Sequence, residues 1–499
     1  MTLRRGLLAG LIGGLALALT QALLRFAGVG LPSELGADLV LPNLPVGEFL
    51  QLLGLLGGSV TAKRQAFFGG FAGSVMAGIA MGFILTLLMR IPALRRHPHR
   101  TLLTALIVVW GATIIALAPV LTSNYRGVPV GLEAPATALG LLIQFAIYVG
   151  VVDLIAITRG AMPSEPEAGR RTLLLAMAGG VLALTTGGLV DMLWRASALE
   201  YDGQQYLGPV QPLTPVDDFY VVTKNLIDPA VFPAIWRLQL DGAVDNPRAF
   251  ELAELMALPA SVQETTLECI SNGVGRGLIS NASWKGIPLA DLLSEAAPHQ
   301  EAVAVAYHGA DGYLNTTSLA TARNRGGLVA WEMNGQRLPE RHGYPLRLLI
   351  PSAYGEVSVK WLTRIEVLRE EEKGYYARQG WEPNFVETSS RIDFPKPQLG
   401  LKVGRPVQVQ GVAYAADRGI EAVELSPDGG TTWIPARISY GQPMTWSLWS
   451  LDWVPATAGT HVLTVRARDG HGIPQVETAR GSAPAGATGL HMVTVKVVA

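Results

Sequence analysis

The sequence predicts three successive architectures: an all-α transmembrane region over residues 1–195, an α+β domain over 196–388 and an all-β sandwich over 389–499. Three observations support this division. Apolar runs of membrane-spanning length are confined to the first part of the chain. The middle part mixes alternating strand patterns with short helical ones. Beyond it, short strand patterns separated by turn signals recur to the end.

Five apolar runs reach the roughly 20 residues that a helix needs to cross a bilayer. They cover residues of about 7–27, 67–89, 101–121, 136–157 and 172–193. The shorter stretch from Val46 to Val60 contains Glu48 and follows two prolines, so we interpret it as interfacial or re-entrant. The formal net charge of -1 gives no sign of nucleic-acid binding, so we expect no such partner.

Basic residues cluster in three segments of this region: Arg4–Arg5, the loop from Arg90 to Arg100, and the loop from Arg159 to Arg171. Basic loops next to membrane helices remain in the cytoplasm. Five crossings place all three segments on one side, whereas six would separate them. The sequence therefore predicts a multi-pass protein with a cytoplasmic amino terminus, and everything after about residue 195 outside.

The apolar runs contain no histidine, and His97 and His99 lie in a predicted cytoplasmic loop. A haem between helices usually needs histidine ligands, so we expect no intrinsic haem. Asp153 and Asp191 lie near the ends of predicted crossings, where we interpret them as residues of the headgroup region. Contact with a quinone or a partner cytochrome stays open.

The second part of the chain begins with a strand and turn over Trp236–Gly242, followed by a short helix over Leu252–Leu258. A strand over Glu264–Ile270 then leads Cys269 into a glycine-containing loop. Lys285–Leu293 is predicted to begin the next helix, and Val303–Tyr313 forms a buried strand that runs into a turn.

Cys269 is the only cysteine of the 499 residues. It cannot form an intrachain disulfide. A lone cysteine is most often a small buried hydrophobic residue. The alternative is a reactive nucleophile or a thiolate ligand to a soft metal.

Five sequence blocks decide between these readings. They are Leu267–Gly273, Ala282–Leu293, Leu328–Gly335, His342–Arg347 and Ser358–Leu362. In this order they resemble the sulfite oxidase family of mononuclear molybdenum enzymes, over roughly residues 211 to 499. The resemblance implies a molybdopterin-dependent oxidoreductase in which Cys269 ligates a molybdenum held by a single molybdopterin.

The resemblance also implies which residues bind the cofactor. They are Phe219, Tyr220, Cys269, His308, Gly309, Ala310, His342, Arg347, Ser358, Val359 and Lys360. The phosphate of the pterin is expected to bind three cationic donors: His342, Arg347 and Lys360. An arginine offers a phosphate two parallel N–H donors, and a lysine offers a compact positive charge. Taken one at a time, each would be read as a solvated surface charge.

Catalytic roles follow from the resemblance for Cys269 and for Arg418, which aligns with an arginine that reaches the substrate pocket of sulfite oxidases. Tyr376 and Arg378 are further candidates for this pocket. Val222 and Val274 stand where sulfite oxidases have arginines, and Arg276 is displaced from that position. These departures leave sulfite doubtful. The segment from Phe219 to Pro229 reads more like the bacterial methionine sulfoxide reductase branch, whereas His342 matches the sulfite oxidase side.

Gly169–Leu175 resembles a twin-arginine export signal, which would suit a domain that folds around its cofactor before crossing the membrane.

Strand patterns over 407–413, 420–425, 433–438, 445–453, 461–468 and 491–498 predict a β-sandwich. Ser426–Trp433 and Trp446–Trp449 resemble the dimerisation domain of the same family, an immunoglobulin-like fold. A homodimer through this domain is the corresponding expectation.

The leading hypothesis is a membrane-bound enzyme that transfers an oxygen atom, with two electrons, to or from a small oxyanion, sulfoxide or related substrate at the outer face of the membrane. Electrons would be exchanged with a separate carrier, a quinone or a cytochrome. The alternative is a non-catalytic membrane scaffold or sensor that retains the fold. The residues leave the substrate and the direction of the reaction open.

Overall fold

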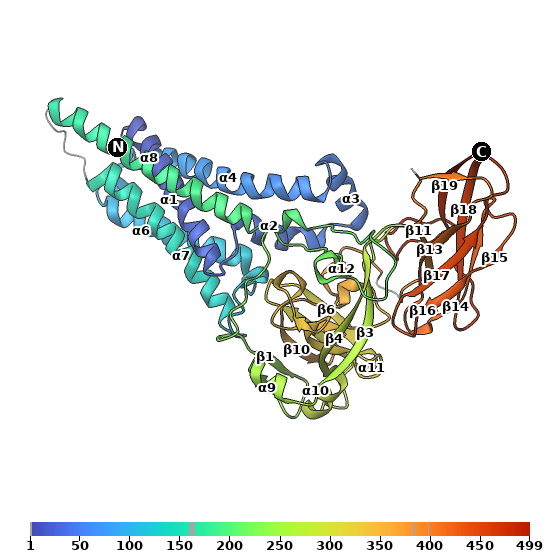
Figure 1. Ribbon diagram of the computed structural model, residues 1–499. Coiled ribbons are helices and arrows are strands. Elements are labelled where there is room, and N and C mark those ends of the chain that lie inside the picture. Colours follow the sequence, from blue (N-terminus) through green and yellow to red (C-terminus); the bar gives the residue numbers. More distant parts are fainter. Residues whose placement is uncertain (1, 159–164, 383–384, 398) are drawn as a thin grey trace.

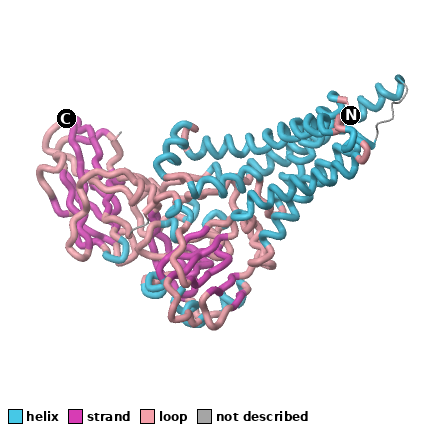
Figure 2. Tube along the Cα trace, turned by 180° about the vertical axis from the view of Figure 1, so that it is seen from behind, coloured by secondary structure: helices cyan, strands magenta, loops and turns pink. Residues whose placement is uncertain are grey.

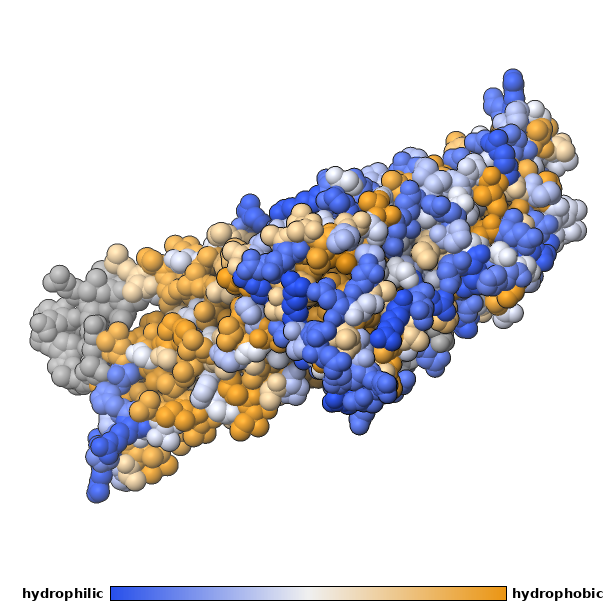
Figure 3. Space-filling model, turned by 90° about the horizontal axis from the view of Figure 1, so that it is seen from below, coloured by the Kyte–Doolittle hydropathy of each residue, from blue (hydrophilic) through white to orange (hydrophobic). Residues whose placement is uncertain are grey.

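The computed structural model describes residues 2–158, 165–382, 385–397 and 399–499. An elongated helical region lies at one end, a mixed domain occupies the middle, and a domain built of strands lies at the other end (Figure 1). The same division appears when the chain is coloured by secondary structure, with helices concentrated at the amino-terminal end (Figure 2). On the face shown in Figure 3, the apolar surface is concentrated over the helical region.

Five long helices form the bundle. They are α1 (Leu3–Phe26), α4 (Ser59–Leu88), α6 (Pro98–Leu117), α7 (Glu133–Val152) and α8 (Glu165–Arg195). Within the described residues, these five segments are long and apolar enough to cross a membrane. Each of the five predicted runs therefore lies on a helix. Shorter elements connect them: α2 (Pro32–Val40), η1 (Leu41–Asn43), α3 (Val46–Leu55), α5 (Pro92–Arg95), η2 (Ala118–Val120) and η3 (Asp153–Thr158).

Helix α1 packs against α4 through glycines. A Cβ atom added at Gly78 would lie 2.5 Å from Gly14 Cα, and one added at Gly82 would lie 2.4 Å from the carbonyl oxygen of Gly6. Small residues at a helix interface allow two backbones to approach closely, as is common between membrane helices. The two helices are therefore in backbone contact. By contrast, α3 buries none of its residues.

The bundle has two distinct ends. At one end the bundle meets the mixed domain: Asn124 N donates to Ala310 O (2.9 Å), and Ala230 N donates to Tyr125 O (3.0 Å). The amino terminus lies at the other end of the bundle (Figure 1).

The mixed domain contains two sheets. The first has the strand order β2-β1-β10-β5-β6, and β1 runs parallel to β10. Its strands are β1 (Leu238–Gly242), β2 (Arg248–Phe250), β5 (Ala304–Gly309), β6 (Leu314–Ser318) and β10 (Leu362–Leu368). Helices α9 (Leu252–Ala257), α10 (Leu289–Ala296) and α11 (Leu319–Asn324) belong to the same domain, with Trp236, Tyr307 and Ile365 fully buried in its core.

The second sheet places the cysteine. Its order is β3-β4-β7-β8, with β9 paired to β7. The strands are β3 (Ser261–Glu268), β4 (Ile279–Pro288), β7 (Leu328–Met333), β8 (Gln336–Arg337) and β9 (Arg347–Leu349). The predicted strand before Cys269 is confirmed. The predicted helix start at Lys285 is wrong, because Lys285 pairs with Val262 in β3 and with Glu332 in β7, and the helix begins at Leu289.

The carboxyl-terminal part consists of two sheets, ordered β11-β13-β17-β16 and β12-β19-β18-β14-β15. Their strands are β11 (Ser389–Phe394), β12 (Gly400–Lys402), β13 (Val407–Tyr414), β14 (Ile420–Ser426), β15 (Ile434–Pro435), β16 (Arg437–Tyr440), β17 (Ser447–Trp453), β18 (Gly459–Asp469) and β19 (His491–Val498). Val409 and Trp449 from one sheet share a core with Leu463 and Val495 from the other. The single strand predicted over 433–438 is wrong, because it divides into β15 and β16 in different sheets.

Candidate functional site

Cys269 lies at the point where β3 ends. Its backbone N–H donates to Leu278 O (2.9 Å), and its carbonyl accepts from Asn272 N (2.8 Å), so the loop folds back on the strand. The thiol Sγ lies 3.1 Å from the Ser271 hydroxyl. The side chain is half-buried and packs against the cluster that contains Phe219, Tyr220 and other apolar residues of the second sheet.

Burial raises the pKa of the Cys269 thiol to about 11; hydrogen bonds from Ser271 oppose the rise, and the charges of Glu356 and Glu268 add to it. The free thiol is therefore protonated at neutral pH and is a poor nucleophile. A cation at the sulfur would displace this proton and stabilise the thiolate. The environment suits a metal ligand better than a solvent-exposed nucleophile.

Phe219 and Tyr220 form a stacked pair beside the cysteine, with ring centroids 5.5 Å apart and an interplanar angle of 19°. Phe219 also contacts Trp284 edge-on at 5.7 Å and His342 at 5.5 Å. These contacts bring three of the predicted cofactor residues to one wall. Such flat, buried aromatic surfaces suit a planar heterocycle.

His342 is buried, and its ring Nε2 is 3.0 Å from the carbonyl of Val216, so this ring N–H donates. Burial lowers the pKa of His342 to about 3, the charge of Arg347 lowers it further, and the bond to Val216 opposes the change. The ring is therefore neutral at pH 7. The expectation that His342 supplies a positive charge is corrected accordingly.

Arg347 and Lys360 are the two cations of this site. Arg347 is 6% exposed and donates to His342 O (3.2 Å), while its Nε has no hydrogen-bond partner. Lys360 Nζ reaches only backbone carbonyls, of Val222 (3.4 Å) and Arg341 (3.3 Å). Burial lowers the pKa of both groups, that of Arg347 to about 10.

Among the described residues, neither Arg347 nor Lys360 forms an ion pair with a carboxylate. A buried charge without a partner is costly. An anionic group with several acceptor oxygens would satisfy both side chains, and a phosphate is such a group. The site therefore fits the phosphate-bearing pterin that the sequence implies.

The turn after β5 lies beside Lys360. A Cβ atom added at Gly309 would lie 2.8 Å from the carbonyl oxygen of Lys360, and Ala310 N donates to Trp361 O (2.9 Å). His308 instead contacts Glu366 through Nε2 (3.1 Å). The structure thus brings Gly309 and Ala310 to the cation site and turns the His308 side chain toward β10.

The segment before Lys360 is a short 3₁₀ turn, η7 (Gly355–Val357). The Ser358 amide donates to Gly355 O (3.1 Å), and its hydroxyl accepts from Ile350 N (3.2 Å). The Val359 amide donates to Val357 O (3.1 Å). Both amides that we expect to reach the cofactor are used within the turn.

The candidate substrate residues differ in their surroundings. Tyr376, in α12 (Tyr375–Arg378), packs against Tyr313 and Tyr375 with ring centroids 5.9 and 5.2 Å away. Burial raises its pKa well above the usual range, and the charges of Tyr375 and Cys269 add to the rise. Arg378 is bound within its own loop, to Lys373 O (3.0 Å).

Arg418 is held by several acceptors. Its Nε forms an ion pair with Asp469 (2.8 Å), and its Nη2 donates to Val386 O (2.9 Å) and to the Thr388 hydroxyl (3.2 Å). Its charge is therefore offset by a carboxylate. A shallow hollow, open to solvent, lies between the cysteine loop and the sandwich, and Arg276, Val274 and Arg391 line it.

Sequence reasoning missed two carboxyls of the site. Both oxygens of Glu356 are shielded from solvent and have no hydrogen-bond partner. Burial raises the pKa of Glu356 to about 8 and that of Glu268, which accepts from Asn272 (2.8 Å), to about 7. The position of Glu268 next to the cysteine was an available signal, whereas nothing in Gly355-Glu356-Val357 indicates burial.

Comparison with known proteins identifies related chains. Residues 225–376 match the family described as an oxidoreductase molybdopterin binding domain. Sulfite oxidase of Arabidopsis thaliana is 30% identical over 273 residues, which cover 45% of this chain and 70% of the plant protein. Sulfite oxidase of Gallus gallus is 30% identical over 300 residues, covering 50% of this chain and 65% of the chicken protein.

Among solved structures, the sulfane dehydrogenase SoxCD from Paracoccus pantotrophus superposes with a TM-score of 0.53 at 23% identity. The match covers 59% of this chain and 85% of that protein. At this level of identity the likeness concerns the fold alone.

Proposed function

Since the chain belongs to the sulfite oxidase family of molybdopterin-dependent oxidoreductases, we propose that it catalyses two-electron oxygen-atom transfer on a small sulfur-oxygen or nitrogen-oxygen substrate at the outer face of a membrane. The observation that carries this proposal is a shared aromatic cluster. Cys269 and Val222 pack against it, Arg347 lies over its Trp284 ring at 5.5 Å, and Lys360 donates to Val222 O. The oxidoreductase relatives do not favour the alternative of a non-catalytic scaffold.

When bound, the molybdenum cofactor supplies the oxygen-atom and electron chemistry. Cys269 would be its metal ligand, and Ser271, 3.1 Å from the sulfur, would steady the thiolate. Phe219 and Tyr220 would form one wall for the pterin. Arg347 and Lys360 would hold its phosphate through charge-assisted hydrogen bonds.

The remaining predicted cofactor residues would act through the backbone. The Gly309–Ala310 turn lies against Lys360. The neutral ring of His342 donates to the carbonyl of Val216 and so holds the chain just before Phe219. Ser358 and Val359 form the turn that leads into Lys360. These residues would set the position of the cations without carrying charge themselves.

The pocket side of Cys269 favours an uncharged substrate. Valines stand at positions 222 and 274, and Arg418 is paired with Asp469. Glu356 adds a carboxyl that is protonated at pH 7, because its pKa is about 8. In this form the carboxyl would add no negative charge to the surroundings of Cys269. Arg378 would lie at the edge of the pocket.

We extend the proposal to the whole chain as follows. Residues 1–195 would form a five-helix membrane anchor with a cytoplasmic amino terminus, and 196–388 the catalytic domain outside. Residues 389–499 would form an immunoglobulin-like domain that supports a homodimer. A separate quinone or cytochrome would exchange electrons with the site. The side chains of the twin-arginine segment, Arg170 and Arg171, lie outside the described residues.

Metal analysis of the purified full chain tests the proposal, followed by dye-coupled assays with sulfite, sulfoxides, nitrate and N-oxides. We expect one molybdenum and one pterin per chain and turnover of an uncharged oxide. Full cofactor loading of both Arg347→Ala and Lys360→Ala would contradict the phosphate assignment. Well-folded protein without molybdenum would refute the proposed function.

A further inference from the structure

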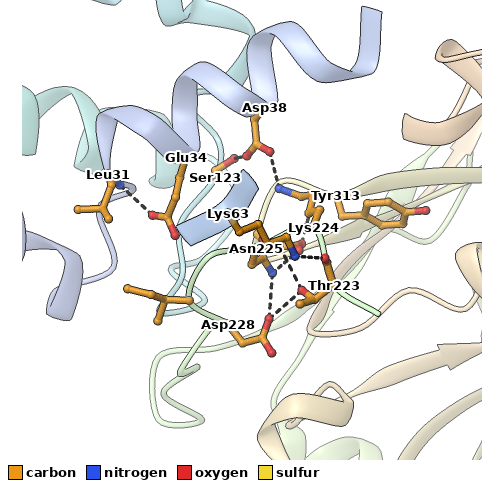
Figure 4. Close-up of polar contacts among 12 residues, drawn as sticks. Leu31, Glu34, Asp38, Lys63, Ser123, Thr223, Lys224, Asn225, Asp228 and Tyr313 are labelled. Carbon is orange, nitrogen blue, oxygen red and sulfur yellow. Dashed lines mark hydrogen bonds and ion pairs between the residues drawn. The ribbon is translucent and has the colours of Figure 1, made fainter. Parts of the chain in front are cut away.

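The outer ends of the membrane helices contact the segment Thr223–Phe232 of the mixed domain, which begins three residues after Tyr220 (Figure 4). Lys224 forms an ion pair with Asp38 of α2 (2.6 Å), and these side chains are only 8% and 13% exposed. Lys63 of α4 forms a second pair with Asp202 (2.8 Å) and also donates to the carbonyl of Thr223. Both pairs join the two regions.

Two arginines extend the same contact. Arg25, at the end of α1, pairs with Glu34 (2.8 Å) and donates to Ile227 O (2.5 Å). Arg126, in the loop between α6 and α7, donates to Phe26 O (2.5 Å) and to Ala230 O (3.0 Å). Four cations therefore hold the segment, and three of them belong to the helical region.

The same network reaches the predicted cofactor residues. Asn225 Nδ2 donates to Asp311 (3.0 Å), the residue after Ala310. The carbonyl of Ala310 accepts a hydrogen bond from Asn124 N of the helical region (2.9 Å). Burial lowers the pKa of Lys360, while the charges of Asp228, Asp311 and Asp202 raise it, so this network is also part of the electrostatic environment of Lys360.

If the helical region served only to anchor the mixed domain, a covalent connection through a solvated linker would be sufficient. Buried ion pairs are costly to assemble, and removing one partner leaves an uncompensated charge. Burial raises the pKa of Asp38, and the charge of Lys224 opposes the rise. Such a contact gives one defined geometry to the segments that it joins, and those segments line the cofactor site.

We propose that Asp38 and Lys63, two residues of the helical region, are positioning residues of the molybdenum site. They fix the Thr223–Asp228 segment, and together with Asn124 they fix the turn at Ala310, so that the cofactor is retained in one geometry only while helices and domain are docked. This inference rests on the proposed function, because it assumes that the cofactor lies at Cys269, Lys360 and Ala310.

The test compares Asp38→Asn with a matched control, Asp191→Asn, in the full chain purified in detergent. Asp191 also pairs with a basic side chain, Arg195 (2.9 Å), but the two are 54% and 78% exposed. Partners behind a metal site commonly change metal affinity by about tenfold or more when they are replaced. We therefore expect about tenfold faster cofactor loss and an altered molybdenum(V) resonance spectrum for Asp38→Asn, and no change for Asp191→Asn.

Lys63→Gln provides a second variant that leaves the Asp38–Lys224 pair intact, and the same two readouts apply. If Asp38→Asn does not fold, Lys63→Gln decides the question. Wild-type cofactor retention and spectrum in Lys63→Gln, or in a folded Asp38→Asn, would overturn the inference. A wild-type chain without molybdenum would instead refute the proposed function, so the two failures are distinguishable.

Discussion

The mixed domain has two neighbours, and the two contacts differ in kind. Toward the helices it uses buried ion pairs, Asp38–Lys224 and Lys63–Asp202. Toward the sandwich its buried contacts are mainly neutral: Trp446 N donates to the Thr266 hydroxyl (2.8 Å) and Tyr414 donates to Thr266 O (3.0 Å).

Apolar side chains reinforce this second contact, including Ile270, Ile279, Trp381, Val412 and Trp446. Apolar burial is non-directional, whereas an ion pair demands one geometry. The helical side is therefore suited to positioning and the sandwich side to stability. Cys269 lies between the two contacts, next to Ile270.

The largest expected effect is loss of the metal on replacement of Cys269, a change that leaves the contacts with the helices and with the sandwich intact. Cys269→Ser removes the thiolate that we propose as the metal ligand, while the hydroxyl keeps the size of the side chain. We expect at least about a hundredfold weaker molybdenum retention with little change in melting temperature, since loss of a ligand exceeds loss of a supporting residue. Elemental analysis and calorimetry measure the two quantities, and unchanged metal content would exclude Cys269 as a ligand.

The contact with the helices is probed by Lys224→Met. It leaves Asp38 buried without its cation, and breaking a buried pair costs about 3–5 kcal/mol. Unfolding monitored by denaturant titration should show this loss together with cofactor release. The exposed pair Arg248–Glu295 is the control, because Arg248→Gln should change stability by about 1 kcal/mol or less.

The contact with the sandwich is probed by Trp446→Phe, which removes the indole N–H that donates to Pro212 O (2.9 Å). The loss of one hydrogen bond and some buried area should cost about 1–3 kcal/mol. We expect the melting temperature to fall while the molybdenum(V) spectrum stays as in the wild type. A changed spectrum would show that the sandwich contact also positions the metal.

The last prediction concerns the pH dependence of stability. The pKa of Glu356 is raised by burial from 4.5 to about 8, so the folded chain binds more protons than the unfolded chain between these values. Stability therefore falls as pH rises through this window. The free energy of unfolding of the cofactor-free chain is measured at pH 5 and at pH 8. In Glu356→Gln the difference between the two values should be smaller than in the wild type, by an amount on the order of a few kcal/mol. Equal pH dependence in both chains would show that the carboxyl is not buried.

Much of the architecture could be predicted from local patterns. Apolar runs of membrane length, the strand before Cys269 and most strands of the sandwich depend on neighbours in sequence. The exceptions have local causes. Lys285 looks like the start of a helix, but its strand pairs on both sides, and the chain between Ile434 and Arg437 changes sheet within two residues.

The parts of the site that escaped prediction depend on distant contacts. Asp38 and Lys224 are 186 residues apart, and a lone charge in a loop reads as solvated. Glu356 gives no sign of burial, and His342 is neutral only because of its surroundings. Charge state and burial are properties of the assembled fold, which the order of residues does not display.

The glycine contact between α1 and α4 has an effect at the end of the bundle that meets the mixed domain. Arg25 lies in the last turn of α1 and Lys63 lies near the start of α4. The spacing of these helices therefore sets the distance between the two cations that donate to the carbonyls of Ile227 and Thr223. A single methyl group at Gly78, meeting Gly14 Cα at 2.5 Å, would force the helices apart. Packing between these two helices is thereby linked to the position of the segment that follows Tyr220.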